Sequence, residues 1–192
     1  MAKLARFLAV AVAAMLLLAG RPAAAYDTDP ENTLIMELPW GNVVIEMLPD
    51  LAPNHVARIK ELVRKGFYDG TPFHRVIAGF MAQGGDPTGT GTGGSGQRIN
   101  AEFSGEHFVR GMVGMARSPT SINSGDSQFF IMLASAPSLD GHYTIWGRVV
   151  KGMENVDKIT KGDPETGRVD NPDHIVHMWV EADRMKDGKI QH

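Results

Sequence analysis

Apolar and polar residues alternate along most of the chain with the period of two that is typical of β-strands. Residues 33–38 and 41–47 show this alternation on either side of Pro39-Trp40, which predicts an antiparallel hairpin. Further strands are expected at 72–76, 80–83, 111–116, 128–133, 145–150 and 174–182. These segments make β-structure the main content of the fold.

Helical periodicity is confined to two segments. Pro53 opens a helix that runs to about Lys65, where Gly66 stops it, and a second short helix is expected at about 153–160. The apolar face of the first helix consists of Val56, Ile59, Leu62 and Val63. Because helices do not alternate with the strands, we expect an antiparallel barrel or sandwich.

Residues 1–25 have the pattern of a cleaved secretory signal peptide. A basic start precedes an uninterrupted apolar run at 7–19, and the small residues at 23–25 suit a signal peptidase. The apolar run is too short to span a bilayer comfortably. We therefore expect a periplasmic or secreted protein without a lipid anchor, whose mature chain starts at Tyr26.

The rest of the chain is long enough for one compact core. We expect a polar lead-in at 26–32, a single domain at 33–182 and a polar C-terminal tail at 183–192.

Composition narrows the function classes. The chain has 19 Lys and Arg against 22 Asp and Glu, a formal net charge of −3, so it lacks the basic footprint of a protein that binds nucleic acid or an anionic membrane. It contains no Cys, which excludes disulfides, thiol catalysis and a lipid-modified cysteine. We expect no membrane attachment after the signal is removed.

Segment 73–86 interleaves a guanidinium, Arg75, and an amide, Gln83, with large apolar side chains. A later strand carries a second amide, Gln128, on the same face as Phe130. Burying two amides and an arginine in an apolar core would cost free energy. The combination favours a groove in which a fixed cation acts on a neutral substrate.

These motifs resemble the cyclophilin family. The matching residues are Phe-His-Arg-Val-Ile-x-Gly-Phe-Met-x-Gln-Gly-Gly-Asp at 73–86, Gly-Met-Val-Gly-Met-Ala at 111–116, Ser-Gln-Phe-Phe-Ile at 127–131 and Leu-Asp-Gly at 139–141. The similarity covers about residues 33–182. It implies a mainly-β fold, a closed eight-stranded antiparallel β-barrel capped by two α-helices, with peptidyl-prolyl cis-trans isomerase activity and no cofactor or metal. The exported form is similar to bacterial periplasmic members.

The resemblance also implies roles for single positions. Arg75 takes the place of the catalytic arginine. The substrate-binding positions are Phe80, Met81, Gln83, Ala116, Arg117, Gln128, Phe130, Leu139 and Tyr143. The implied partners are proline-containing unfolded or partly folded polypeptides, whose folding the enzyme would assist, and we expect a monomer.

Two positions depart from the pattern of many eukaryotic members. Ser138 stands where they have a Trp, and Tyr143 stands where they have a His. Ser138 lacks an indole donor and its apolar area, so we expect at most weak binding of cyclosporin. Tyr143 still supplies an aromatic wall and a hydroxyl, so we expect catalysis to survive.

Other readings are weaker. A binding module of the same fold would hold proline segments with little turnover, and only Arg75 argues against it. Ser127 follows Gly-Asp as in some serine hydrolases, but Gln128 follows it where those enzymes have Gly. His174 and His177 are three apart, so in a strand they point to opposite faces and cannot chelate one ion. The glycine-rich segment 84–96 lacks a phosphate-binding Lys and predicts a long surface loop.

Overall fold

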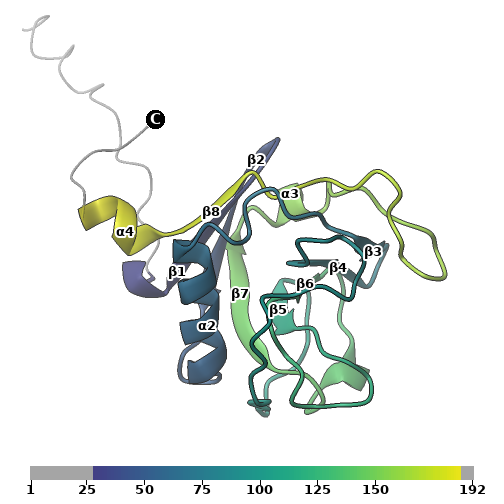
Figure 1. The fold of residues 1–192 in the computed structure, drawn as a ribbon, viewed down its shortest axis with the longest axis horizontal. Helices are drawn as coiled ribbons and strands as arrows, with labels where there is room; N and C mark the ends of the chain where they lie inside the picture. The colour runs from purple at the N-terminus through teal and green to yellow at the C-terminus, as the bar shows by residue number, and fades with distance from the viewer. Residues whose placement is uncertain (1–27, 187–192) are drawn as a thin grey trace, which may run out of the picture.

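The computed structural model describes residues 28–186, so the expected signal peptide and the last six residues of the chain lie outside the described part. The strands are β1 (Thr33–Leu38), β2 (Gly41–Met47), β3 (Arg75–Ile77), β4 (Met81–Gly84), β5 (Met112–Met115), β6 (Phe129–Met132), β7 (Ile145–Lys151) and β8 (His177–Val180). The helices are α2 (Pro53–Arg64), α3 (Met153–Val156) and α4 (Glu181–Lys186), and the 3-10 turns are η1 (Pro30–Asn32) and η2 (Pro137–Leu139). Figure 1 shows these elements along the chain.

The eight strands form one antiparallel sheet in the order β3-β4-β6-β5-β7-β2-β1-β8. The two end strands do not pair with each other, so the expected closed barrel is wrong: the sheet is an open half-barrel. The segments that precede β3 and β8 do meet, since Phe73 N donates to Asp173 O at 2.9 Å and Ile175 N donates to Thr71 O at 3.0 Å.

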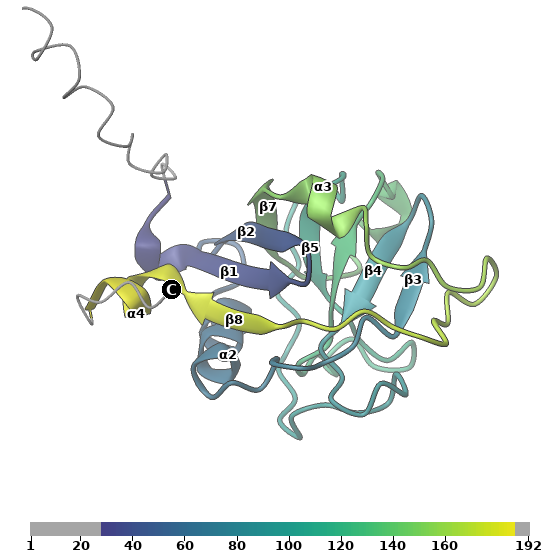
Figure 2. The same cartoon turned by 90° about the horizontal axis from the view of Figure 1, so that it is seen from above.

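The open edge at β3 is covered by another segment of the chain. Val76 N donates to Gly167 O at 2.8 Å, and Gly162 N donates to Val76 O at 2.9 Å. The loop between α3 and β8 therefore satisfies the outward backbone groups of the edge strand, which removes the need for closure. Figure 2 shows this loop passing beside β3.

The hairpin β1–β2 and helix α2 confirm the sequence prediction, and Gly66 ends the helical segment with a φ of +66°. Two other expectations need correction. Helix α3 is shorter than the expected 153–160. The last strand ends at Val180 instead of residue 182, and a third helix, α4, replaces the end of the expected strand and the start of the expected tail. No helix of the described residues is both long and apolar enough to cross a membrane.

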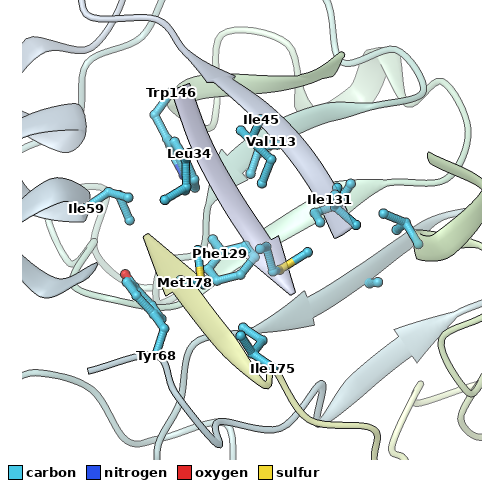
Figure 3. Packing of buried hydrophobic residues seen from close by; sticks show 14 of the residues in the cluster. Leu34, Ile45, Ile59, Tyr68, Val113, Phe129, Ile131, Trp146, Ile175 and Met178 are labelled. Atoms are coloured by element: carbon cyan, nitrogen blue, oxygen red, sulfur yellow. The ribbon is translucent and has the colours of Figure 1, made fainter. Parts of the chain in front are cut away.

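The alternation along β6 separates two apolar clusters. Phe129 and Ile131 point into the main core, together with Trp146 and Tyr68, as Figure 3 shows. Phe130 and Met132 belong to a second, smaller cluster, with Met81 of β4. The second cluster forms the floor of the site described next.

Candidate active site

A cavity of about 210 Å³ lies at the second cluster. Its lining consists of Arg75, Phe80, Met81, Gln83, Ala116, Arg117, Phe130, Leu139 and Tyr143. All of these residues were expected at the site from the sequence. They come from separate parts of the chain, and the fold brings them together around this cavity. Two larger cavities, of about 720 and 630 Å³, flank it and share Gln83 with it.

Aromatic rings form one wall of this cavity. Phe130 is 5% exposed, and its ring meets Tyr143 edge to face, with ring centres 5.7 Å apart. On the other side Phe108 lies 5.5 Å away, centre to centre. Leu139, from η2, completes the apolar lining. These side chains give one side of the cavity a small apolar wall of the kind found in small-molecule sites, opposite its polar side.

Phe130 has this position because Gly114, opposite it on β5, has no side chain. A Cβ at Gly114 would lie 2.4 Å from Phe130 Cζ and 2.8 Å from Phe108 Cε1. The glycine thus leaves the space in which both rings pack.

Arg75 forms the polar side of the cavity and is held at two of its three nitrogens. Nε donates to Thr166 O at 3.0 Å, and Nη1 donates to Gln83 Oε1 at 3.3 Å. Nη1 also lies 3.9 Å from Met81 Sδ. Among the described residues, none accepts a hydrogen bond from Nη2. Since the guanidinium is planar, fixing Nε and Nη1 also fixes the direction of Nη2.

Gln128 does not line this cavity. It lines the neighbouring cavity of about 630 Å³, and its Oε1 accepts a hydrogen bond from Gln83 Nε2 at 2.9 Å. Its own Nε2 donates to Gly91 O at 3.0 Å and to Gly93 O at 2.8 Å. Gln128 therefore links the glycine-rich loop to Gln83, and through it to Arg75.

The glycine-rich loop is a surface loop, as expected, and Asp86 organises it. Asp86 is fully buried, and its carboxylate accepts hydrogen bonds from the backbone N of Thr88 at 2.8 Å, Gly91 at 2.7 Å and Gly93 at 3.0 Å. Burial alone would raise the pKa of Asp86, but these bonds outweigh it, and the net pKa is lowered.

Ala116 and Arg117 form the rim. Ala116 N donates to Gln128 O at 2.9 Å, which extends the β5–β6 pairing by one residue. The Arg117 guanidinium lies 4.6 Å above the centre of the Tyr143 ring, and its Nε donates to His142 O at 3.0 Å.

His74, the residue before Arg75, is buried, and neither of its ring nitrogens has a hydrogen-bond partner among the described residues. Burial lowers the pKa of His74, against the opposing effect of Asp86. Burial therefore favours the neutral form of this imidazole.

The serine hydrolase alternative does not fit the geometry. Ser127 is fully buried, and its hydroxyl donates to Gly85 O at 2.8 Å. The hydroxyl is thus a structural link between β6 and the glycine-rich loop.

Sequence reasoning missed Thr166. It lies in a polar loop about ninety residues after Arg75, and it acts through a backbone carbonyl, which any residue carries. The only local signal was Asp163 three residues earlier, a spacing that often marks a turn held by its side chain.

Comparison with known proteins gives concordant results. A family model described as cyclophilin type peptidyl-prolyl cis-trans isomerase/CLD matches residues 33–180. A protein of Brucella suis named probable peptidyl-prolyl cis-trans isomerase is 52% identical over 189 residues, which cover 91% of this chain and 96% of that protein. An Arabidopsis thaliana protein named peptidyl-prolyl cis-trans isomerase CYP18-2 is 42% identical over 154 residues, which cover 78% of this chain and 90% of that protein.

Solved structures agree. A cyclophilin from Hirschia baltica superposes with a TM-score of 0.71 at 32% identity, over 81% of this chain and 76% of that one. A cyclophilin-type isomerase from Cryptosporidium parvum, solved in the presence of the dipeptide Ala-Pro, superposes with a TM-score of 0.70 at 28% identity. The superposition covers 77% of this chain and 98% of that one.

Proposed function

This chain belongs to the cyclophilin family of peptidyl-prolyl cis-trans isomerases, and from that premise we propose that Arg75 is its catalytic residue and that it acts on exported polypeptides. The remaining lining residues of the 210 Å³ cavity bind the substrate. The isomerase accelerates rotation about Xaa-Pro peptide bonds.

The reaction sets the requirements for the site. Rotation about a peptide bond faces a barrier of about 18–20 kcal/mol because the C–N bond has partial double-bond character. For Xaa-Pro the two isomers are close in energy, yet exchange takes about 10–100 s without a catalyst. In the twisted transition state resonance is lost and the prolyl nitrogen gains a localised lone pair. A donor directed at that nitrogen stabilises the twisted state more than the planar one.

The single observation that carries the proposal is the hydrogen bonding of the Arg75 guanidinium. Its Nε and Nη1 are engaged by Thr166 and Gln83, and its Nη2 has no acceptor among the described residues. Nη2 is therefore available to donate to a prolyl nitrogen whose ring occupies the apolar cavity. The guanidinium does this without losing its proton, and exclusion of water by the rings strengthens the bond.

The other residues hold the substrate. Phe80, Met81, Phe130, Leu139 and Tyr143 surround the proline ring, and Gln83 donates to or accepts from its backbone. Ala116 and Arg117, at the rim, pair with the extended peptide. Gln128 acts through Gln83, with which it shares a hydrogen bond of 2.9 Å.

Exchange NMR on a small panel of Xaa-Pro peptides tests this function against a binding module of the same fold. We expect cis and trans peaks of each peptide to exchange at catalytic protein concentrations. Binding shifts without exchange would identify a module that only holds proline segments.

We further propose export, with folding of exported proteins as the biological role. The pattern of residues 1–25 supports export, and unfolded exported chains supply accessible Xaa-Pro bonds. Cell fractionation with N-terminal sequencing tests it. We expect a periplasmic or secreted monomer that starts at Tyr26, and an intact N-terminus in the cytoplasm would contradict export.

A further inference from the structure

The loop at 162–169 does more than pair with the backbone of β3, because it also contacts the side chain of Arg75. Gly167 lies flat against β3 with a φ of +78°, and a Cβ there would lie 2.6 Å from Ile77 Cγ1 and 3.0 Å from Arg75 Cγ. The neighbouring carbonyl, of Thr166, accepts the hydrogen bond from Arg75 Nε. The orientation of the Thr166–Gly167 peptide therefore decides where the guanidinium points.

In addition to the bond from Val76 N to Gly167 O that anchors the loop to β3, Asp163 holds that peptide from within the loop. Its Oδ1 accepts from Thr166 N at 2.8 Å, from Thr166 Oγ1 at 2.9 Å and from Glu165 N at 3.1 Å. Its backbone carbonyl accepts from Gly167 N at 2.7 Å, so the peptide is held on both sides. The bonds from Thr166 also lower the pKa of Asp163, which keeps the carboxylate ionised.

We propose that Asp163 is a positioning residue for the isomerase reaction: it holds the Thr166 carbonyl where that carbonyl fixes Arg75 Nε and thereby aims Nη2 into the cavity. This inference rests on the proposed catalytic role of Arg75. Asp163 does not line the 210 Å³ cavity and touches no part of the substrate site directly. Its effect is transmitted through one backbone carbonyl.

The role of Asp163 is one of orientation. Arginine is a long side chain with several rotatable bonds, so holding it in one conformation costs rotamer entropy. Loss of the Nε contact would leave the guanidinium attached only at Nη1, through a 3.3 Å bond to Gln83 Oε1. The planar group could then rotate about that contact, and a misplacement of about 1 Å of a reacting group can lower a rate about 10²-fold.

The test compares Asp163→Ala with two matched variants. Asp163→Asn keeps an oxygen that can accept the same bonds. Asp170→Ala removes a carboxylate from the same loop that is 89% exposed and lies 3.8 Å from Arg168 Nε. Turnover is measured by exchange NMR with kcat and KM separated, and the Nε–Hε signal of Arg75, assigned by its absence in Arg75→Ala, reports the hydrogen bond itself.

We expect Asp163→Ala to lower kcat about tenfold with KM nearly unchanged, and to shift the Arg75 Hε signal and speed its exchange with water. Asp163→Asn should have a kcat and an Arg75 Hε signal close to those of the wild type, and Asp170→Ala should resemble the wild type in both quantities. If Asp163→Ala does not fold, Thr166→Ala, which removes one of the three bonds to Oδ1, takes its place with smaller changes in the same directions.

The outcomes separate this inference from the proposed function. Unchanged kcat or an unchanged Hε signal in the Asp163 variant, with Arg75→Ala inactive, would overturn the positioning role and leave the function standing. Full activity of Arg75→Ala would overturn both.

Discussion

Arg75 and Gln83 face each other directly across the β3–β4 ladder, with Arg75 Nη1 3.3 Å from Gln83 Oε1. The tight turn at Gly79, with a φ of +70°, folds segment 73–86 back on itself and brings the two polar groups together. A cation and an amide eight residues apart therefore act as one unit at the edge of an apolar cavity.

Gln83→Ala should lower kcat/KM about tenfold, because Arg75 would lose one of the two contacts that hold its guanidinium. Gln128→Ala, one step further along the hydrogen-bond chain, should have a smaller effect. Gln97→Ala, an amide exposed on the surface, is the matched control. Equal activity of the Gln83 and Gln97 variants in a protease-free peptide assay would show that the pairing plays no part in turnover.

Gly114→Ala should deform the substrate pocket. The new Cβ would collide with the rings of Phe130 and Phe108, at a cost of about 1–3 kcal/mol in the free energy of unfolding, and KM should rise. Gly105→Ala is the control, since a Cβ there meets nothing within 4 Å. Urea unfolding and peptide kinetics measure both effects, and a Gly114 variant as stable and active as the Gly105 variant would contradict the packing described here.

All but one of the residues expected at the site lie together around one cavity, whereas the expected closure of the sheet is wrong. Motif residues such as Arg75 and Phe130 stand out in the sequence by their chemical types and by the family motifs that contain them. Closure of the sheet depends instead on backbone pairing, and the segment that covers Val76 does so through Gly162 and Gly167, whose backbone groups carry no side-chain signal.

Helix α4 and the Thr166 contact escaped prediction for related reasons. Residues 181–182 were expected to end the last strand and residues 183–192 to form a polar tail, but in the structure residues 181–186 form a helix next to β1 (Figure 2). Thr166 contributes a carbonyl, and nothing in its residue type distinguishes that carbonyl from its neighbours.

Stability should fall as the pH is lowered below about 6.5, and His74 should contribute to the fall. Burial lowers the pKa of folded His74 below its ordinary value of about 6.5. The unfolded chain then binds the proton first, so the contribution is fully present above pH 6.5 and is lost as the pH falls toward the folded pKa.

His74→Gln removes this titration. The slope of unfolding free energy against pH, measured with urea between pH 7.5 and 5, should become shallower by up to about 1.4 kcal/mol per pH unit. Some slope should remain, because burial also lowers the pKa of His55. An unchanged slope would mean that His74 is not held neutral in the folded state.

Cyclosporin should bind weakly to the wild-type protein, and Ser138→Trp should increase the affinity. Ser138 lies in η2, is exposed and precedes Leu139 of the cavity wall, so an indole there would add apolar area and an N–H donor at the rim. Titration calorimetry compares the two proteins, with Ser135→Trp as the control at another exposed serine. Equal cyclosporin affinity in the Ser138 and Ser135 variants would contradict this prediction.

The most direct test of the account is the activity of Arg75→Ala in the protease-free assay of proline isomerisation. We expect kcat/KM to fall at least about 10²-fold with the fold intact by circular dichroism, since one transition-state donor is lost. Arg148→Ala, which removes an exposed guanidinium paired with Glu46, should keep wild-type activity. A folded Arg75→Ala protein with a near-wild-type rate would contradict the proposed mechanism.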